Sequence, residues 1–220
     1  MWNSNELNAN GEENAAMRNG ASRALFDYWN RIRRGRFAPW RSEIEPADIH
    51  TLLPDVFIIE SAEQSDFRFR LAGTRMCAAY RRELKGQDFM SLWSATDREG
   101  METVMHNIAR DGAVGVITLT CTSNREQHLR MEMVIMPLRH HDGEISRFIG
   151  VLSGAELPYW LGTNPVVSQS ADSVRLLWPE DRNDEDRRAV NQSDTRVGEF
   201  FGRPARRVRH LAVYDGGLSD

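Results

Sequence analysis

The feature that most constrains the fold is residues 67–74, Phe-Arg-Phe-Arg-Leu-Ala-Gly-Thr, in which large apolar and basic side chains alternate. Alternation with a period of two is typical of a β-strand with one buried face, because successive side chains point to opposite sides of a sheet. We expect Phe67, Phe69 and Leu71 on the buried face. Gly73 permits a sharp turn, and Thr74 can accept a backbone N–H at the start of a helix. The segment therefore predicts a strand that leads directly into a helix.

Four further segments have the length and apolar content of strands, at residues 56–60, 114–122, 129–138 and 145–152. The last two are joined through an Asp-Gly pair at 142–143, a strong hairpin signal. A helix is predicted over 96–110, where Thr96 and Glu99 have the spacing of a capping box. Two strands, then helices, then three strands predict an α+β domain: a five-stranded antiparallel sheet with helices on one face.

An amphipathic helix is predicted at residues 21–34. Its apolar stripe comprises Ala21, Ala24, Leu25, Tyr28, Trp29 and Ile32 at about 100° per residue. Several predicted strands are apolar on both faces, so the second face of the sheet needs a cover. We expect this helix to supply that cover through Leu25, Trp29 and Ile32. A homodimer contact through the same stripe is the alternative.

Several motifs in combination resemble a known family. Three prolines, Pro39, Pro46 and Pro54, bracket an extended connection before the first strand, and Arg-Glu-Leu-Lys-Gly stands at 82–86. With the strand that ends in Ala-Gly-Thr, this pattern is similar to the single-PAS-domain family of alphaproteobacteria, formerly described as a domain of unknown function. The similarity covers about residues 21–152, and Arg81 departs from it where the family pattern has glycine. The resemblance implies a PAS-like fold.

The composition changes at both ends of the predicted domain. Residues 1–20 contain six asparagines, and the chain after residue 160 is rich in Ser, Asn, Asp and Arg, with an acidic run at 180–186. We therefore expect a disordered tail at 1–20, the PAS domain with its N-terminal cap helix at 21–160, and a largely disordered tail with short docking segments at 161–220. Residues 208–214 alternate like a lone strand that adds to a sheet edge of this chain or of a partner. A disordered end is the alternative.

Charge and composition exclude several classes of function. A net charge of -4 and a pI near 5.9 provide no global attraction to nucleic acid or anionic membranes. The two cysteines, Cys77 and Cys121, lack the spacing of a zinc site, so no metal is expected. Neither a signal peptide nor a stretch of about 18 apolar residues is present, which predicts a soluble cytoplasmic protein.

Motifs that carry catalysis or bind the usual PAS cofactors are absent. The sequence has no nucleophile elbow, zinc-protease, P-loop or dinucleotide fingerprint, so we expect no enzyme activity. His106 lies about 150° from the centre of the buried face of its helix and should face water, which argues against haem. Cys77 is followed by two alanines and not by the arginine of a photosensory flavin site. We therefore expect no cofactor.

The remaining inward-facing residues predict either a small apolar ligand pocket or a filled core, and three methionines would make such a pocket adaptable. The candidate lining residues are Phe69, Leu71, Met76, Tyr80, Phe89, Met105, Ile117, Leu119, Met133 and Ile135.

The expected function is that of a non-catalytic regulatory protein that acts by binding another protein. Its candidate contact residues are Leu25, Trp29, Ile32, Trp178, Arg206, Arg207, Leu211 and Val213. A ligand-sensing PAS domain is the first alternative. The second is a nucleic-acid contact through the arginines of residues 203–209, although the overall acidity and the missing interleaved aromatic residues argue against it.

Overall fold

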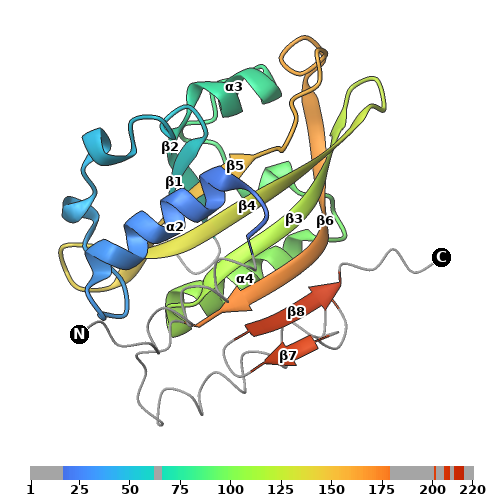
Figure 1. Cartoon of the computed structure of the whole chain (residues 1–220). Coiled ribbons are helices and arrows are strands. Elements are labelled where there is room, and N and C mark those ends of the chain that lie inside the picture. The colour runs from blue at the N-terminus through green and yellow to red at the C-terminus, as the bar shows by residue number, and fades with distance from the viewer. Residues whose placement is uncertain (1–16, 62–65, 179–200, 202–205, 209–210, 216–220) are drawn as a thin grey trace.

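The strands pair antiparallel in one sheet of a computed structural model (Figure 1), which describes residues 17–61, 66–178, 201, 206–208 and 211–215. The order is β2-β1-β5-β4-β3-β6-β8-β7. The six longer strands are β1 (Val56–Ser61), β2 (Phe67–Ala72), β3 (Val114–Ser123), β4 (His128–Arg139), β5 (Ile145–Ser153) and β6 (Val166–Leu177). Two short strands, β7 (Arg206–Val208) and β8 (Leu211–Asp215), extend the sheet beyond β6.

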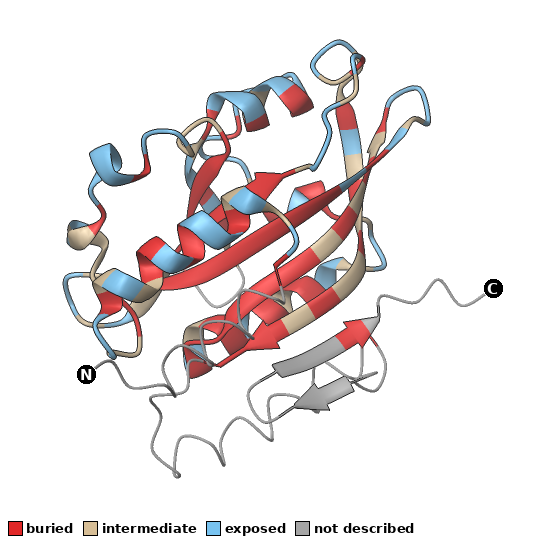
Figure 2. Cartoon of the chain, in the orientation of Figure 1, coloured by how far each residue is buried: buried red, intermediate tan, exposed pale blue. Residues whose placement is uncertain are grey.

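Helices cover both faces of the sheet. Helices α3 (Thr74–Tyr80) and α4 (Arg98–Asp111) lie on one face, and α2 (Gly20–Arg33) lies across the other, as Figures 1 and 2 show. Short 3₁₀ turns occur at η1 (Arg41–Glu43), η2 (Pro46–Ile49) and η3 (Met90–Leu92). The apolar residues accordingly form two cores, an inner core under α3 and α4 and an outer core under α2.

The predicted packing of the N-terminal helix is confirmed. Leu25 and Trp29 are fully buried in the outer core, and the indole Nε1 of Trp29 donates to the carbonyl oxygen of Pro137 at 2.8 Å. Phe26, which lies outside the predicted stripe, is also buried, whereas Ile32 is only partly buried. Met17 is buried as well, so ordered packing begins within the predicted tail at 1–20.

The prediction that Leu71 lies on the buried face is wrong, because β2 contains an irregularity. Ile58 pairs with Leu71 while the next residue, Ile59, pairs with Phe69, so Arg70 is an extra residue at a β-bulge. The alternation of faces is interrupted there. The side chain of Leu71 is 41% exposed as a result.

The prediction of five strands is also wrong, because β6 lies in the segment expected to be disordered. It pairs with β3 from Val114↔Leu177 to Ser123↔Val166. Two register shifts interrupt its pairing, and its outward face carries Ser170 and Asp172, so no regular alternation of apolar residues marks it in the sequence. The segment at 208–214 forms parts of β7 and β8, and β8 pairs with β6.

Arg81, the departure from the family pattern, ends α3 in the left-handed region with φ 49° and ψ 36°. Glycine adopts this conformation most easily, and an arginine occupies it at some conformational cost. Its backbone N–H is satisfied by carbonyl oxygens of the last turn of α3. The turn therefore forms as the family pattern implies, with a different residue.

Candidate functional site

The predicted pocket residues lie together in the inner core, apart from Leu71. The other nine are buried members of one cluster. Phe69 and Phe89 contact edge to face with ring centroids 5.6 Å apart, and Phe89 meets Trp93 in the same way at 5.9 Å. Met105 and Met133 are fully buried beside them. The aromatic rings thus occupy the space between the sheet and the helices.

A small cavity of about 50 Å³ lies between α3 and the end of β5. Its walls are mainly apolar, and one polar end is formed by Asp55, Arg75 and Ser153. Among the predicted pocket residues, Met76 lines it. Pockets for drug-sized ligands have volumes of about 300–1,000 Å³, so this cavity has room for a few atoms only.

The polar end of this cavity contains an ion pair between the buried Asp55 and the half-exposed Arg75. Nη1 of Arg75 donates to Oδ2 of Asp55 at 2.6 Å. Burial raises the pKa of the Asp55 carboxyl, while the positive charge of Arg75 opposes that shift. The hydroxyl of Ser153 is buried without a hydrogen-bond partner within the described residues. The sequence offered no signal for this arrangement, because its residues come from three separate elements.

Two ionisable side chains in the inner core are held in their protonated forms. The hydroxyl of Tyr80 donates to Oε1 of Gln169, and burial raises its pKa well above the usual range. Burial likewise raises the pKa of the Cys121 thiol to about 12, against a smaller opposing effect of the hydrogen bond with Tyr80. Thiols react as thiolates, so Cys121 is an inert core residue at neutral pH.

A buried carboxylate fixes the start of α2 to the sheet. Glu132 on β4 accepts hydrogen bonds from the backbone N–H groups of Arg18 and Asn19, at 2.9 and 3.0 Å. Nη2 of Arg175 on β6 lies 3.4 Å from the same carboxylate. Burial lowers the pKa of Arg175, and Glu132 opposes that shift. Sequence analysis missed this anchor, although an acid within the apolar strand β4 was a signal for it.

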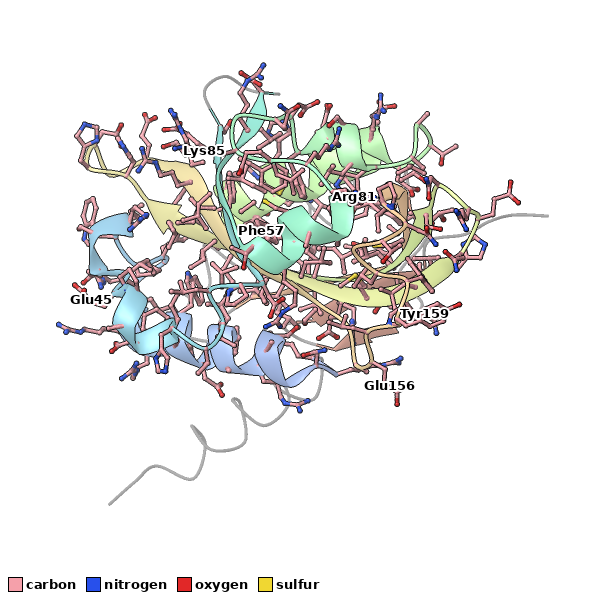
Figure 3. The ribbon with its side chains drawn as sticks, turned by 90° about the horizontal axis from the view of Figure 1, so that it is seen from above. Glu45, Phe57, Arg81, Lys85, Glu156 and Tyr159 are labelled. Carbon is pink, nitrogen blue, oxygen red and sulfur yellow. The ribbon has the colours of Figure 1, made fainter. Side chains whose placement is uncertain are left out.

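The loop after β5 carries the most exposed of the large apolar side chains identified. Tyr159 is 94% exposed, and Leu157, which also lines the small cavity, is 47% exposed. Figure 3 shows Tyr159 and Glu156 at one side of the molecule, pointing outward. The apolar run Leu-Pro-Tyr-Trp at 157–160, just after the last predicted strand, was the available sequence signal.

The predicted contact residues divide into two groups. Leu25, Trp29 and Trp178 are buried in the two cores and are therefore core residues, not exposed contact residues. Ile32 packs against the outer core and is partly buried. The remaining four, Arg206, Arg207, Leu211 and Val213, lie in β7 and β8, and their side chains are outside the described part of the structure.

Comparison with models of known protein families identifies the family of this domain. A family model described as "PAS domain" matches residues 17–153. The chain belongs to the PAS domain family. PAS domains serve sensing and signalling. The match includes the five strands β2-β1-β5-β4-β3 of the sheet, and β6 lies beyond it.

Several solved structures resemble this PAS domain at low identity. One, from "Flavin Analogue Sheds Light on Light-Oxygen-Voltage Domain Mechanism", is 17% identical, covers 50% of this chain and 83% of its own, and has a TM-score of 0.41. The dark structure of the blue-light photoreceptor Aureochrome1 LOV is 14% identical over 49% and 80%, with a TM-score of 0.40. The light-state dimer of the fungal photoreceptor Vivid is 15% identical over 45% and 76%, with a TM-score of 0.36. No curated protein matches the PAS chain.

Among the described residues, no helix has both the length and the apolar character required to cross a membrane.

Proposed function

We propose that this PAS protein is a non-catalytic cytoplasmic regulator that signals by binding another protein through the loop at residues 154–161. The observation that carries the proposal is the exposed aromatic ring of Tyr159 next to the half-exposed Leu157. Tyrosine is enriched at the energetic centres of protein interfaces, because it buries a large rigid surface and keeps a polar hydroxyl. Because the ring of Tyr159 is 94% exposed, it buries almost no surface within its own chain and contributes little to the stability of the fold.

The state of the inner core supports a non-catalytic role. Its aromatic residues pack against one another, and burial keeps Tyr80 and Cys121 protonated. Neither group can then supply the anionic nucleophile or base that catalysis with these side chains requires.

The loop also has a short physical connection to α2. It follows directly on Ser153, which pairs with Glu132 across β5 and β4, and Glu132 holds the backbone that enters α2. Under this proposal, a partner that shifts the end of β5 changes the hydrogen bonds that anchor the helix.

Affinity capture with matched variants tests the proposal. The 220-residue chain and its Tyr159→Phe, Tyr159→Ala and Glu45→Ala variants are immobilised and exposed to extract from the native cell. We expect one set of partners on the first two and on the Glu45→Ala control, and its loss on Tyr159→Ala. Equal capture by the Tyr159→Ala variant would contradict the proposal.

Sensing of a small molecule is the second candidate, favoured by the cavity at Asp55, Arg75 and Ser153. The hydroxyl of Ser153, which has no hydrogen-bond partner among the residues that the structure describes, gains one if a small polar ligand enters. Native mass spectrometry of protein from its own host tests this candidate. A retained small molecule that is lost from a Ser153→Ala variant would favour sensing over protein binding alone.

A further inference from the structure

The turn between β4 and β5, at the left of Figure 1, places three metal-ligating side chains together. The backbone N–H of His140 donates to the carbonyl oxygen of Glu144 at 2.9 Å, and that of Gly143 donates to His140 at 2.9 Å. Gly143 has a φ of 89°, which closes the turn. These bonds fix the backbone from which His140, His141 and Asp142 project.

The ligand atoms of the three side chains converge. Nδ1 of His140 and Nδ1 of His141 face one another, with ring planes at 85° and centroids 3.9 Å apart. Oδ2 of Asp142 lies 3.5 Å from Nδ1 of His140, and the donor atoms of all three residues lie within 4.8 Å of one another. The other oxygen, Oδ1, accepts the backbone N–H of Glu144 at 3.0 Å, which orients the carboxylate.

Two neutral imidazole nitrogens that face each other need a proton or a cation between them, because lone pairs repel. Two imidazole nitrogens and one carboxylate oxygen form a donor set that suits zinc, nickel or copper, whereas magnesium and calcium prefer oxygen ligands alone.

We propose that the β4–β5 turn binds one divalent transition-metal ion through Nδ1 of His140, Nδ1 of His141 and an oxygen of Asp142. Water completes the coordination. Metal–ligand bonds of about 2.0–2.2 Å in a tetrahedral site put neighbouring ligand atoms about 3.4 Å apart. The 3.5 Å between Nδ1 of His140 and Oδ2 of Asp142 already matches this spacing, whereas the Nδ1 atoms of His140 and His141 lie closer together and must move apart when the ion binds.

The charges around the turn permit a cation. The guanidinium of Arg139 lies over the ring of Trp40, 5.8 Å from its centroid, and not in the ligand cluster. Asp142 and Glu144 place two acidic residues within the turn itself. The local charge therefore does not oppose a divalent ion.

Trp40 offers a local probe of the site, because its ring lies against the turn. A methyl group at position 143 would lie 4.0 Å from Cη2 of the Trp40 indole, which is van der Waals contact. Paramagnetic Cu²⁺ bound at His140 and His141 should therefore quench Trp40 fluorescence. A Trp40→Phe variant should lose most of this quenching while it keeps its affinity for zinc.

The experiment uses the whole 220-residue chain without a histidine tag. Calorimetric titration with Zn²⁺, Ni²⁺ and Cu²⁺ should give one ion per chain for at least one of these metals. We expect His140→Ala, His141→Ala and Asp142→Asn to weaken binding at least about tenfold, since even outer-shell changes cost 10–100-fold. His128→Ala, at an exposed histidine on β4, is the matched control and should bind as the parent does.

Circular dichroism verifies that each variant folds, and the isosteric Asp142→Asn change tests the site even if a histidine variant fails to fold. The proposal is overturned if none of the three metals binds the parent protein. It is equally overturned if the turn variants bind as tightly as the parent, or if His128→Ala weakens binding as much as they do.

Discussion

At the scale of single residues, Trp29 makes one of the contacts that fix α2 to the sheet. Its ring is fully buried, and its Nε1 donates to the carbonyl oxygen of Pro137. Trp29→Ala should lower the free energy of unfolding by about 3–5 kcal/mol, because it leaves a cavity and removes a buried hydrogen bond to the Pro137 carbonyl. Urea denaturation measures this loss. Tyr159→Ala, at a nearly fully exposed ring, is the control and should change stability by about 0.5 kcal/mol or less.

Glu60 gives the fold a predictable sensitivity to acid. Burial acts to raise its pKa, but hydrogen bonds from Arg70 and Arg147 outweigh burial and hold the pKa below the usual 4.5. A folded pKa below the unfolded value means stabilisation that is present above the unfolded pKa and is lost as the pH falls through the folded pKa. We expect Glu60→Gln to be destabilising at neutral pH.

The same reasoning predicts that the difference between Glu60→Gln and the parent shrinks as the pH is lowered from about 5 to about 3. Urea midpoints across this range measure it, with Glu126→Gln in the exposed β3–β4 turn as the control. A difference that stays constant with pH would show that the carboxylate charge of Glu60 is not responsible.

Sequence reasoning succeeded at residues where burial follows periodicity and failed where contacts are made across the sheet. Phe67 and Phe69 are buried as the alternation predicts, but the bulge at Arg70 exposes Leu71. A bulge depends on the partner strand, which period-two alternation alone does not reveal. The role of Glu132 was hidden for the same reason, since its partners are more than a hundred and about forty residues away in sequence.

At the scale of elements, β6 converts β3 from an edge strand into a central one. Strand β3 pairs with β4 on one side and with β6 on the other. In the predicted five-stranded sheet, every second amide of β3 would face solvent or a side chain. With β6 present, consecutive amides over residues 115–122, and not only every second one, should exchange slowly.

Hydrogen exchange measured by nuclear magnetic resonance tests this arrangement. Strand β4 is the internal reference, because it is paired on both sides in the sheet with β6 and in the predicted sheet without it. Slow exchange at consecutive β3 amides supports the six-stranded core. Fast exchange at alternate β3 amides would mean that β6 is not paired in solution.

The capping box predicted from Thr96 and Glu99 does not form at the start of α4. The helix begins at Arg98 with Asp97 as its N-cap, and no side-chain cap is formed. Oδ2 of Asp97 instead accepts the backbone N–H of Ala171 on β6 and the hydroxyl of Ser94. A local pattern predicted the position of the helix within two residues, whereas a partner 74 residues away decided how Asp97 is used.

At the scale of the whole molecule, both faces of the sheet are covered by parts of the chain itself, and aromatic side chains pack the inner core. His106 is an exposed residue of α4, and its imidazole packs edge to face on the ring of Phe67 at the margin of that core, with centroids 5.5 Å apart. The purified protein should therefore have no absorbance band in the visible region. A band that survives dialysis would show that haem or flavin is bound and that the core opens to admit it.

The central claim is that this PAS protein signals through a protein contact at the 154–161 loop. The most direct test replaces Tyr159 with a photo-crosslinking phenylalanine derivative in the native cell. Glu45, at the opposite side of the view in Figure 3, is the matched control position. The account predicts a specific protein-sized adduct at position 159 and none at position 45. Irradiation that yields no adduct at position 159, or the same adducts at both positions, would contradict it.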